Sequence, residues 1–153
     1  MLVMGRTEDG WVKEGLGEYV SRLRHYVQFS VEELPQLKGV GSLSRDELKS
    51  REGALLLRRV KDTDTVVLLD ERGKMMRSTE FSAFISKTLS HLRGDLVFVV
   101  GGAFGFSQEV YGRSNAMLSL SSMTFSHQMV RVFFAEQLYR AFTIMKGEPY
   151  HNE

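Results

Sequence analysis

Two stretches of this chain are almost wholly apolar, and they limit the folds open to it more than any other feature does. They are Thr65–Asp70 (TVVLLD) and Leu96–Val100 (LVFVV). A strand with one solvent-exposed face alternates polar and apolar residues, whereas an unbroken apolar run is typical of a strand buried on both faces. Strands of that kind lie in parallel sheets that helices cover on both sides. The two stretches therefore predict the interior of an α/β fold.

Segments with helical spacing lie between the strands along the whole chain. Ser44–Glu47 fits a capping box, in which the serine caps a backbone amide and the glutamate reaches back, and Glu71–Lys74 is expected to be a Gly-containing loop. The predicted strands are Met1–Met4, Phe29–Glu32, Thr65–Asp70, Leu96–Val100 and Ala116–Leu120, and the predicted helices are Trp11–Tyr26, Ser44–Val60, Ser78–Leu89, Ser107–Arg113 and His127–Met145. This alternation predicts an α/β fold with a mostly parallel sheet and helices on both faces. A chain of 153 residues is most simply one domain, residues 1–153.

The overall charge gives no sign of a nucleic-acid partner, because 20 Lys and Arg residues nearly balance 19 Asp and Glu residues. RNA binding would need a local basic patch. Two clusters could supply one, and they either contact a nucleic acid or lie on solvated helix faces. They are Arg22 with Arg24, and Arg51 with Arg58, Arg59 and Lys61.

Several functional classes are excluded by what the chain lacks. It has no cysteine, so disulfides and thiolate metal sites cannot form. The four histidines show none of the spacings of metal-binding motifs, and we expect no metal. No apolar run is long enough to span a membrane and no signal-peptide pattern opens the chain, so we expect a cytoplasmic protein with no membrane partner.

The carboxyl ends of two predicted strands mark the expected ligand site. In open parallel sheets ligands bind at this edge, where the chain places Leu69 with Asp70 and Gly101 with Gly102. The two glycines either let a flat ligand lie on the backbone or allow a tight turn. Their G-G-x-x-G spacing differs from the dinucleotide fingerprint, and no Walker lysine is present. A Rossmann dinucleotide site and a P-loop are therefore not expected.

A second candidate ligand segment is Leu118–Ser126 (LSLSSMTFS), which alternates apolar and hydroxyl residues before the last predicted helix. Its short polar side chains and free amides could bind an adenine edge and a ribose. Serine hydroxyls also bind the local backbone readily, so the same pattern fits a plain strand followed by a serine-rich turn. Composition alone does not separate these two interpretations.

The last predicted helix is apolar almost all round, which is typical of a helix buried on two sides. In so small a chain the second side is most simply another copy, and we expect a two-fold homodimer. Arg131, Glu136 and Arg140 are charged exceptions on this helix, and such charges are either paired or functional. After the helix, Tyr150 could stack on a base and His151 could act as a proton acceptor, although chain ends are usually frayed.

Four segments, in this order, closely resemble one family of RNA-modifying enzymes. They are VVGGAFGFS (Val99–Ser107), LSLSSMTFSHQMVRV (Leu118–Val132), EQLYRA (Glu136–Ala141) and GEPYH (Gly147–His151). On these motifs the chain resembles the RlmH family of 23S rRNA pseudouridine N3-methyltransferases, which belongs to the SPOUT superfamily. The likeness extends over essentially the whole chain and includes WVKEG (Trp11–Gly15) and LLDERGK (Leu68–Lys74).

The resemblance implies a fold and a cofactor that composition does not show. The fold is a parallel sheet with a deep trefoil knot in its C-terminal part, the SPOUT α/β knot. The knot loops form a pocket for S-adenosyl-L-methionine, and the family is homodimeric through the C-terminal helix. The positions that match the cofactor site are Leu69, Gly101, Gly102, Leu120, Ser121, Ser122, Met123, Thr124 and Phe125.

The resemblance also implies a reaction, the methylation of N3 of a pseudouridine in 23S rRNA on the assembled 70S ribosome. We expect Arg140 to stabilise the charge that develops on the base, and Tyr150 and His151 to complete the pocket. In a dimer the tail that carries Tyr150 and His151 could come from either subunit. Either His151 or solvent accepts the N3 proton. Two alternatives stay open: a methyltransferase of the same superfamily that acts on tRNA, and a non-catalytic dimeric RNA-binding module.

Overall fold

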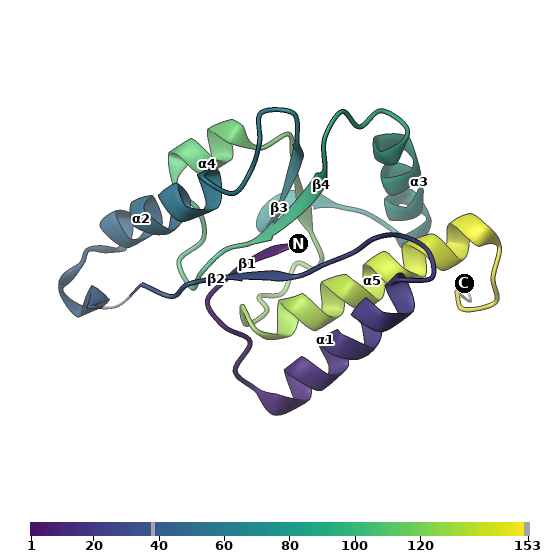
Figure 1. Ribbon diagram of the computed structural model, residues 1–153, viewed down its shortest axis with the longest axis horizontal. Coiled ribbons are helices and arrows are strands. Elements are labelled where there is room, and N and C mark those ends of the chain that lie inside the picture. The colour runs from purple at the N-terminus through teal and green to yellow at the C-terminus, as the bar shows by residue number, and fades with distance from the viewer. Residues whose placement is uncertain (38, 152–153) are drawn as a thin grey trace.

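The computed structural model describes residues 1–37 and 39–151, and within them the strands form one parallel sheet (Figure 1). The strand order is β2-β1-β4-β3-β5, and every pairing between neighbours is parallel. The two apolar stretches pair at the centre, from Thr65 opposite Leu96 to Leu69 opposite Val100. The strands are β1 (Leu2–Met4), β2 (Glu32–Leu34), β3 (Thr65–Met75), β4 (Leu96–Val100) and β5 (Ala116–Ser119). The predicted α/β class with a parallel sheet is confirmed.

Helices cover both faces of the sheet, as the sequence predicts. On one face are α1 (Gly10–Leu23), α3 (Ser78–Leu89) and α5 (Met129–Lys146), and on the other are α2 (Arg45–Leu57) and α4 (Gln108–Arg113). Each face of the sheet therefore has its own hydrophobic core. Successive side chains of a strand point to opposite faces, so Val67 of β3 packs in the core under α1, α3 and α5, whereas Val66 and Leu68 pack in the core under α2 and α4. A short 3₁₀ helix, Val40–Ser42, precedes α2.

Most helices and strands begin and end close to the positions that the sequence predicts. The capping box of α2 is present, because the Ser44 hydroxyl accepts from the Glu47 amide at 3.2 Å and the Glu47 carboxylate accepts from the Ser44 amide at 2.8 Å. β2 lies later than the predicted Phe29–Glu32. It pairs only with the three residues of β1, and it ends immediately before Pro35.

The predicted loop at Glu71–Lys74 is wrong, because β3 continues through it. β5 pairs with this strand twice: Leu118 lies opposite Leu69 and again opposite Lys74, with an irregularity between the two pairings. Gly73 makes the second pairing possible, since a Cβ there would lie 2.6 Å from backbone atoms of Leu118. The glycine therefore serves the close approach of two strands and not a turn.

Within one chain, α5 already has partners on two sides. It lies between α1 and α3 (Figure 1), and Phe134, Leu138 and Phe142 are buried. Its apolar character is thus explained in large part by its own chain, because two helices and the sheet cover it. Phe133 is still 42% exposed, so an apolar face remains on α5. The homodimer and the trefoil knot stay predictions.

Candidate active site

A cavity of about 700 Å³ lies at the carboxyl ends of β4 and β5, beside the part of β3 where its pairing with β4 ends. Its wall comes mainly from residues 69–72 of β3, residues 100–106 after β4, and the segment that leaves β5 and leads into α5. In parallel sheets the loops of neighbouring strands converge at this edge, which is why ligand sites form there. We term this space the strand-end cavity.

The structure brings eight of the nine predicted cofactor positions to this one cavity. Ser122 is the exception, because it is exposed and does not line the space. The lining positions are Leu69, Gly101, Gly102, Leu120, Ser121, Met123, Thr124 and Phe125. Ser121 also holds its own loop, since its carbonyl accepts from the Ser119 hydroxyl and its hydroxyl accepts from the Met123 amide, each at 2.9 Å. Both interpretations of this segment therefore apply, a lining segment and a serine-stabilised turn.

Side chains from other segments lie close against the two glycines. A Cβ on Gly101 would be 3.1 Å from the Phe106 ring, and one on Gly102 would be 2.5 Å from a carboxylate oxygen of Glu52. The turn occurs just after them, where the Gly105 amide donates to the Gly102 carbonyl at 3.2 Å and Gly105 has a φ of 79°. A tight turn and a close approach to the backbone are thus combined in one loop.

A polar group lines the strand-end cavity; the sequence reasoning placed its Asp70 at the site but missed Arg72 and Tyr111. The Asp70 carboxylate, 7% exposed, accepts from the Tyr111 hydroxyl at 2.6 Å and from the Arg72 amide at 2.9 Å. The Arg72 guanidinium lies 4.3 Å from the Tyr111 ring centre and 3.3 Å from the carboxylate. Burial by itself raises the pKa of Asp70, but these donors outweigh it and hold the pKa below its usual value. Asp70 at a strand end was the available signal, whereas nothing in the sequence pairs it with Tyr111.

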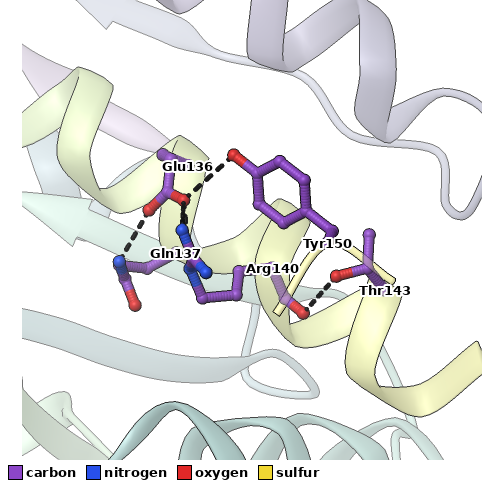
Figure 2. A network of polar contacts seen from close by, with 5 residues as sticks. All are labelled: Glu136, Gln137, Arg140, Thr143 and Tyr150. Atoms are coloured by element: carbon purple, nitrogen blue, oxygen red, sulfur yellow. Dashed lines mark hydrogen bonds and ion pairs between the residues drawn. The ribbon is translucent and has the colours of Figure 1, made fainter. Parts of the chain in front are cut away.

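Two of the three predicted catalytic residues, Arg140 and Tyr150, form a separate cluster near the C-terminal end of α5 (Figure 2). Arg140 binds a carboxylate oxygen of Glu136 at 2.6 Å, and the Tyr150 hydroxyl donates to the same oxygen at 3.2 Å. The Arg140 guanidinium lies 4.8 Å from the Tyr150 ring centre, and His151 follows as a half-buried residue. Burial, together with Tyr19 and Glu136, raises the pKa of Tyr150. We term Glu136, Arg140 and Tyr150 the Arg140 cluster.

Residues 147–151, which follow α5, are held in place by contacts with the rest of the chain. The Tyr26 hydroxyl bonds the Glu148 carboxylate, and the Glu148 amide donates to the Thr143 carbonyl at 3.0 Å. Tyr150 also packs edge-on against Tyr139, with ring centres 4.8 Å apart. The described part of this segment is therefore ordered, and its functional role stays a prediction.

In one chain the Arg140 cluster and the strand-end cavity do not meet. Val130, in the first turn of α5, lines the cavity, whereas Arg140 lies ten residues further along the helix. A rise of 1.5 Å per residue separates them by about 15 Å. None of Arg140, Tyr150 and His151 is among the described residues that line the cavity.

The sequence was also compared with those of known protein families. A family model described as "Predicted SPOUT methyltransferase" matches residues 1–151. The chain belongs to the SPOUT methyltransferase family. The predicted resemblance is thereby confirmed at the level of the family.

Curated relatives of this SPOUT methyltransferase match it along its whole length. The "Ribosomal RNA large subunit methyltransferase H" of Parabacteroides distasonis is 46% identical over 153 residues, covering 100% of this chain and 98% of the relative. The protein of the same name from Cytophaga hutchinsonii is 49% identical over 149 residues, covering 97% and 96%. A solved structure titled "Crystal structure of an hypothetical protein" has a TM-score of 0.53 at 14% identity, covering 94% of this chain and 66% of that chain. This last similarity concerns the fold alone.

A SPOUT methyltransferase needs a methyl donor, and the strand-end cavity has the volume of a typical small-molecule site. Among residues 1–37 and 39–151, no group of three or more His, Asp or Glu side chains is placed to hold a metal ion. In the same residues we find no helix with the length and apolar character needed to cross a membrane.

Replacing Tyr111 with Phe should destabilise this SPOUT methyltransferase by about 1.5–3 kcal/mol at pH 7, the usual contribution of one hydrogen bond to a charged group. The ring that contacts Arg72 is kept, so the change removes only the donor to Asp70. Because the folded-state pKa of Asp70 is depressed, the contribution is present above the unfolded pKa, about 4, and is lost as pH falls through the folded value. Urea unfolding at pH 7 and pH 3 measures the size of the destabilisation and its dependence on pH. An equal loss of stability at the two pH values would contradict the pairing.

Proposed function

We propose that the chain is an S-adenosyl-L-methionine-dependent methyltransferase that methylates N3 of a pseudouridine in 23S rRNA, on the assembled 70S ribosome. The observation that carries the proposal is the convergence of eight family-matched cofactor positions on one cavity at the strand ends. The curated relatives named as large-subunit rRNA methyltransferases, similar over their full length, support the substrate class. We also infer that residues 1–153 act as one domain in the cytoplasm, where ribosomes are found.

The residues of the strand-end cavity suit this donor by their chemistry. Leu69, Leu120 and Phe125 offer apolar surface to an adenine ring, and Gly101 and Gly102 contribute backbone without side chains to the same wall. S-adenosyl-L-methionine supplies a methyl group that its sulfonium already activates. The protein's task is then to align the methyl group with its acceptor and to exclude water.

The Arg140 cluster supplies what the acceptor needs. N3 of pseudouridine is an imide nitrogen that must lose its proton, which leaves negative charge on the flanking carbonyl oxygens. Arg140, held by Glu136, stabilises that charge, and the Tyr150 ring stacks against the base. His151 or solvent accepts the proton.

A homodimer would join the cavity of one protomer to the Arg140 cluster of its partner. Phe125 lines the strand-end cavity and packs on Phe133 of α5, with ring centres 4.9 Å apart. Since Phe133 is 42% exposed, a partner seated on this face of α5 would lie directly beside the cavity. Such an arrangement brings together two groups that one chain keeps apart.

The basic clusters are weaker RNA candidates than their composition suggests. Arg22 is paired with Glu18 and Arg59 with Glu32, so part of their charge is neutralised. Arg51 and Arg58 are exposed on and just after α2 and are the better candidates for phosphate contacts.

The test is methyl transfer from labelled S-adenosyl-L-methionine to 70S ribosomes, isolated subunits, free rRNA and tRNA, with the modified base mapped. We expect label on N3 of a pseudouridine of 23S rRNA, strongest with 70S particles. Transfer to tRNA alone would replace the substrate with that of the first alternative. Binding of RNA without binding of the donor would establish the non-catalytic module instead.

A further inference from the structure

A second, smaller cavity of about 220 Å³ adjoins the strand-end cavity. The two share a wall made by Gly102, Ala103, Phe104 and His127. Small-molecule sites usually start near 300 Å³, so this side cavity suits an appendage of a ligand rather than a whole one. An appendage could extend into it from a ligand in the larger space.

The side cavity contains a carboxylate that lacks a partner. Glu52 of α2 lines it, and the Glu52 carboxylate lies so near the Gly102 backbone that a Cβ there would be 2.5 Å from one oxygen. Among the residues that the structure describes, none donates a hydrogen bond to this carboxylate. Burial raises the pKa of Glu52. A half-buried carboxylate without a donor is unfavourable by itself, and a cationic ligand group would relieve that cost.

A positive charge lines the same side cavity. Arg6 follows β1, and its backbone is clamped to the start of α5 by Gln128, whose side-chain amide donates to the Arg6 carbonyl at 2.8 Å and accepts from the Glu8 amide at 3.2 Å. Glu8 lines the cavity as well. The other walls are mostly apolar and include Met4, Leu37, Val40, Leu48 and Phe104.

We propose that the side cavity binds the amino-acid end of the methyl donor, with its α-ammonium on Glu52 and its α-carboxylate on Arg6. The inference rests on the proposed function, because it assumes that the nucleoside end of the same donor occupies the strand-end cavity. A zwitterion on a short apolar chain matches an acid and a base that line one small cavity with apolar walls. Gly102 is then essential at the junction, since any side chain there would displace the Glu52 carboxylate.

The experiment is calorimetric titration of the whole protein with four ligands that share the adenosine part and differ in the amino-acid end or in the charge on sulfur. They are S-adenosyl-L-methionine, its demethylated product S-adenosylhomocysteine, decarboxylated S-adenosylmethionine, and 5′-methylthioadenosine, which lacks the amino-acid end. The variants are Glu52→Gln and Arg6→Gln, and Glu14→Gln, on an exposed position of α1, is the matched control. Thermal unfolding of each variant establishes that it is folded.

We expect Glu52→Gln to weaken the binding of the first three ligands on the order of tenfold or more, the effect of one charge-assisted hydrogen bond. Arg6→Gln should weaken S-adenosyl-L-methionine and S-adenosylhomocysteine but leave the decarboxylated donor unchanged. Binding of 5′-methylthioadenosine should be the same in all variants. S-adenosylhomocysteine has no sulfonium charge. Weaker binding of this ligand by Glu52→Gln therefore identifies the ammonium as the group that Glu52 binds.

Two outcomes separate this inference from the proposed function. If the unmodified protein binds none of the four ligands, the proposed function itself is overturned. If it binds them and Glu52→Gln behaves like Glu14→Gln, or weakens 5′-methylthioadenosine equally, the amino-acid site is overturned and the cofactor assignment stands. The unmodified protein also gives an answer without any variant, since it must bind S-adenosylhomocysteine more tightly than 5′-methylthioadenosine.

Discussion

Replacing Arg131 with Met is expected to lower the free energy of unfolding by about 4 kcal/mol, because several buried acceptors would lose their donor at once. Arg131 is fully buried on α5. Its guanidinium donates to the Met4 carbonyl at 2.7 Å, the Thr7 hydroxyl at 2.8 Å, the His127 carbonyl at 3.0 Å and the Gly5 carbonyl at 3.2 Å. A loss of this size is a large part of the stability of an ordinary domain.

The same substitution should weaken donor binding in the protein that remains folded. The His127 carbonyl is held by Arg131, and His127 lines both the strand-end cavity and the side cavity. Urea unfolding measures stability, and titration with S-adenosylhomocysteine at a temperature where the variant is folded measures the site. Arg131→Lys is the control, since it keeps the charge but cannot reach four acceptors. Its free energy of unfolding should lie between those of the unmodified protein and Arg131→Met. A stability change below about 1 kcal/mol for Met would contradict this role.

The second large effect is the recovery of activity when two inactive variants are combined. Arg140→Gln should reduce methyl transfer on the order of 100-fold or more, the usual cost of losing a group that stabilises developing charge. Gly101→Val should distort the wall of the strand-end cavity and abolish donor binding, because even a Cβ there lies 3.1 Å from the ring of Phe106, which also lines the cavity. Each variant alone is then inactive for a different reason.

Co-expression of the two variants with different tags, followed by isolation of the mixed dimer, tests how the site is built. If each site takes its cavity from one protomer and its Arg140 cluster from the other, one of the two sites in the mixed dimer is intact, and about half of the wild-type rate returns. If each site lies within one chain, no activity returns. The mixture of the Arg140→Gln variant with itself is the control. Monomeric protein at working concentration would overturn the shared site directly.

Much of the fold could be predicted because its signals are local. The apolar runs at β3 and β4 are short and rich in β-branched residues, which favours buried strands, and Ser44 with Glu47 marks the start of α2 within four residues of sequence. The position of the site followed from the same signals, since loops after neighbouring parallel strands must share one edge of the sheet. Leu69 and Gly101 were therefore predictable as lining residues.

Other features could not be predicted because they depend on contacts between distant parts of the chain. The loop expected at Glu71–Lys74 is a strand, because Gly73 lies on the backbone of Leu118. The partner of Asp70 is Tyr111, 41 residues away, and the carboxylate beside Gly102 comes from Glu52 of another helix. No spacing rule connects such pairs, so the sequence alone does not show that these residues are in contact.

The two arginines of α5 show what the sequence determines and what only the tertiary structure decides. From the sequence by itself, Arg131 and Arg140 were equivalent: each is a cation on an apolar helix that must be paired or functional. Only the tertiary structure separates them, because Arg131 reaches backbone carbonyls as far as 127 residues away, whereas Arg140 pairs with Glu136 one turn before it and lies beside the tail. The sequence determined the class of fold and the edge of the sheet where the site lies, through the local periodicity of apolar residues. The tertiary structure decided which polar residue supports the fold and which remains available for chemistry, because that depends on the neighbours that folding brings to each charge.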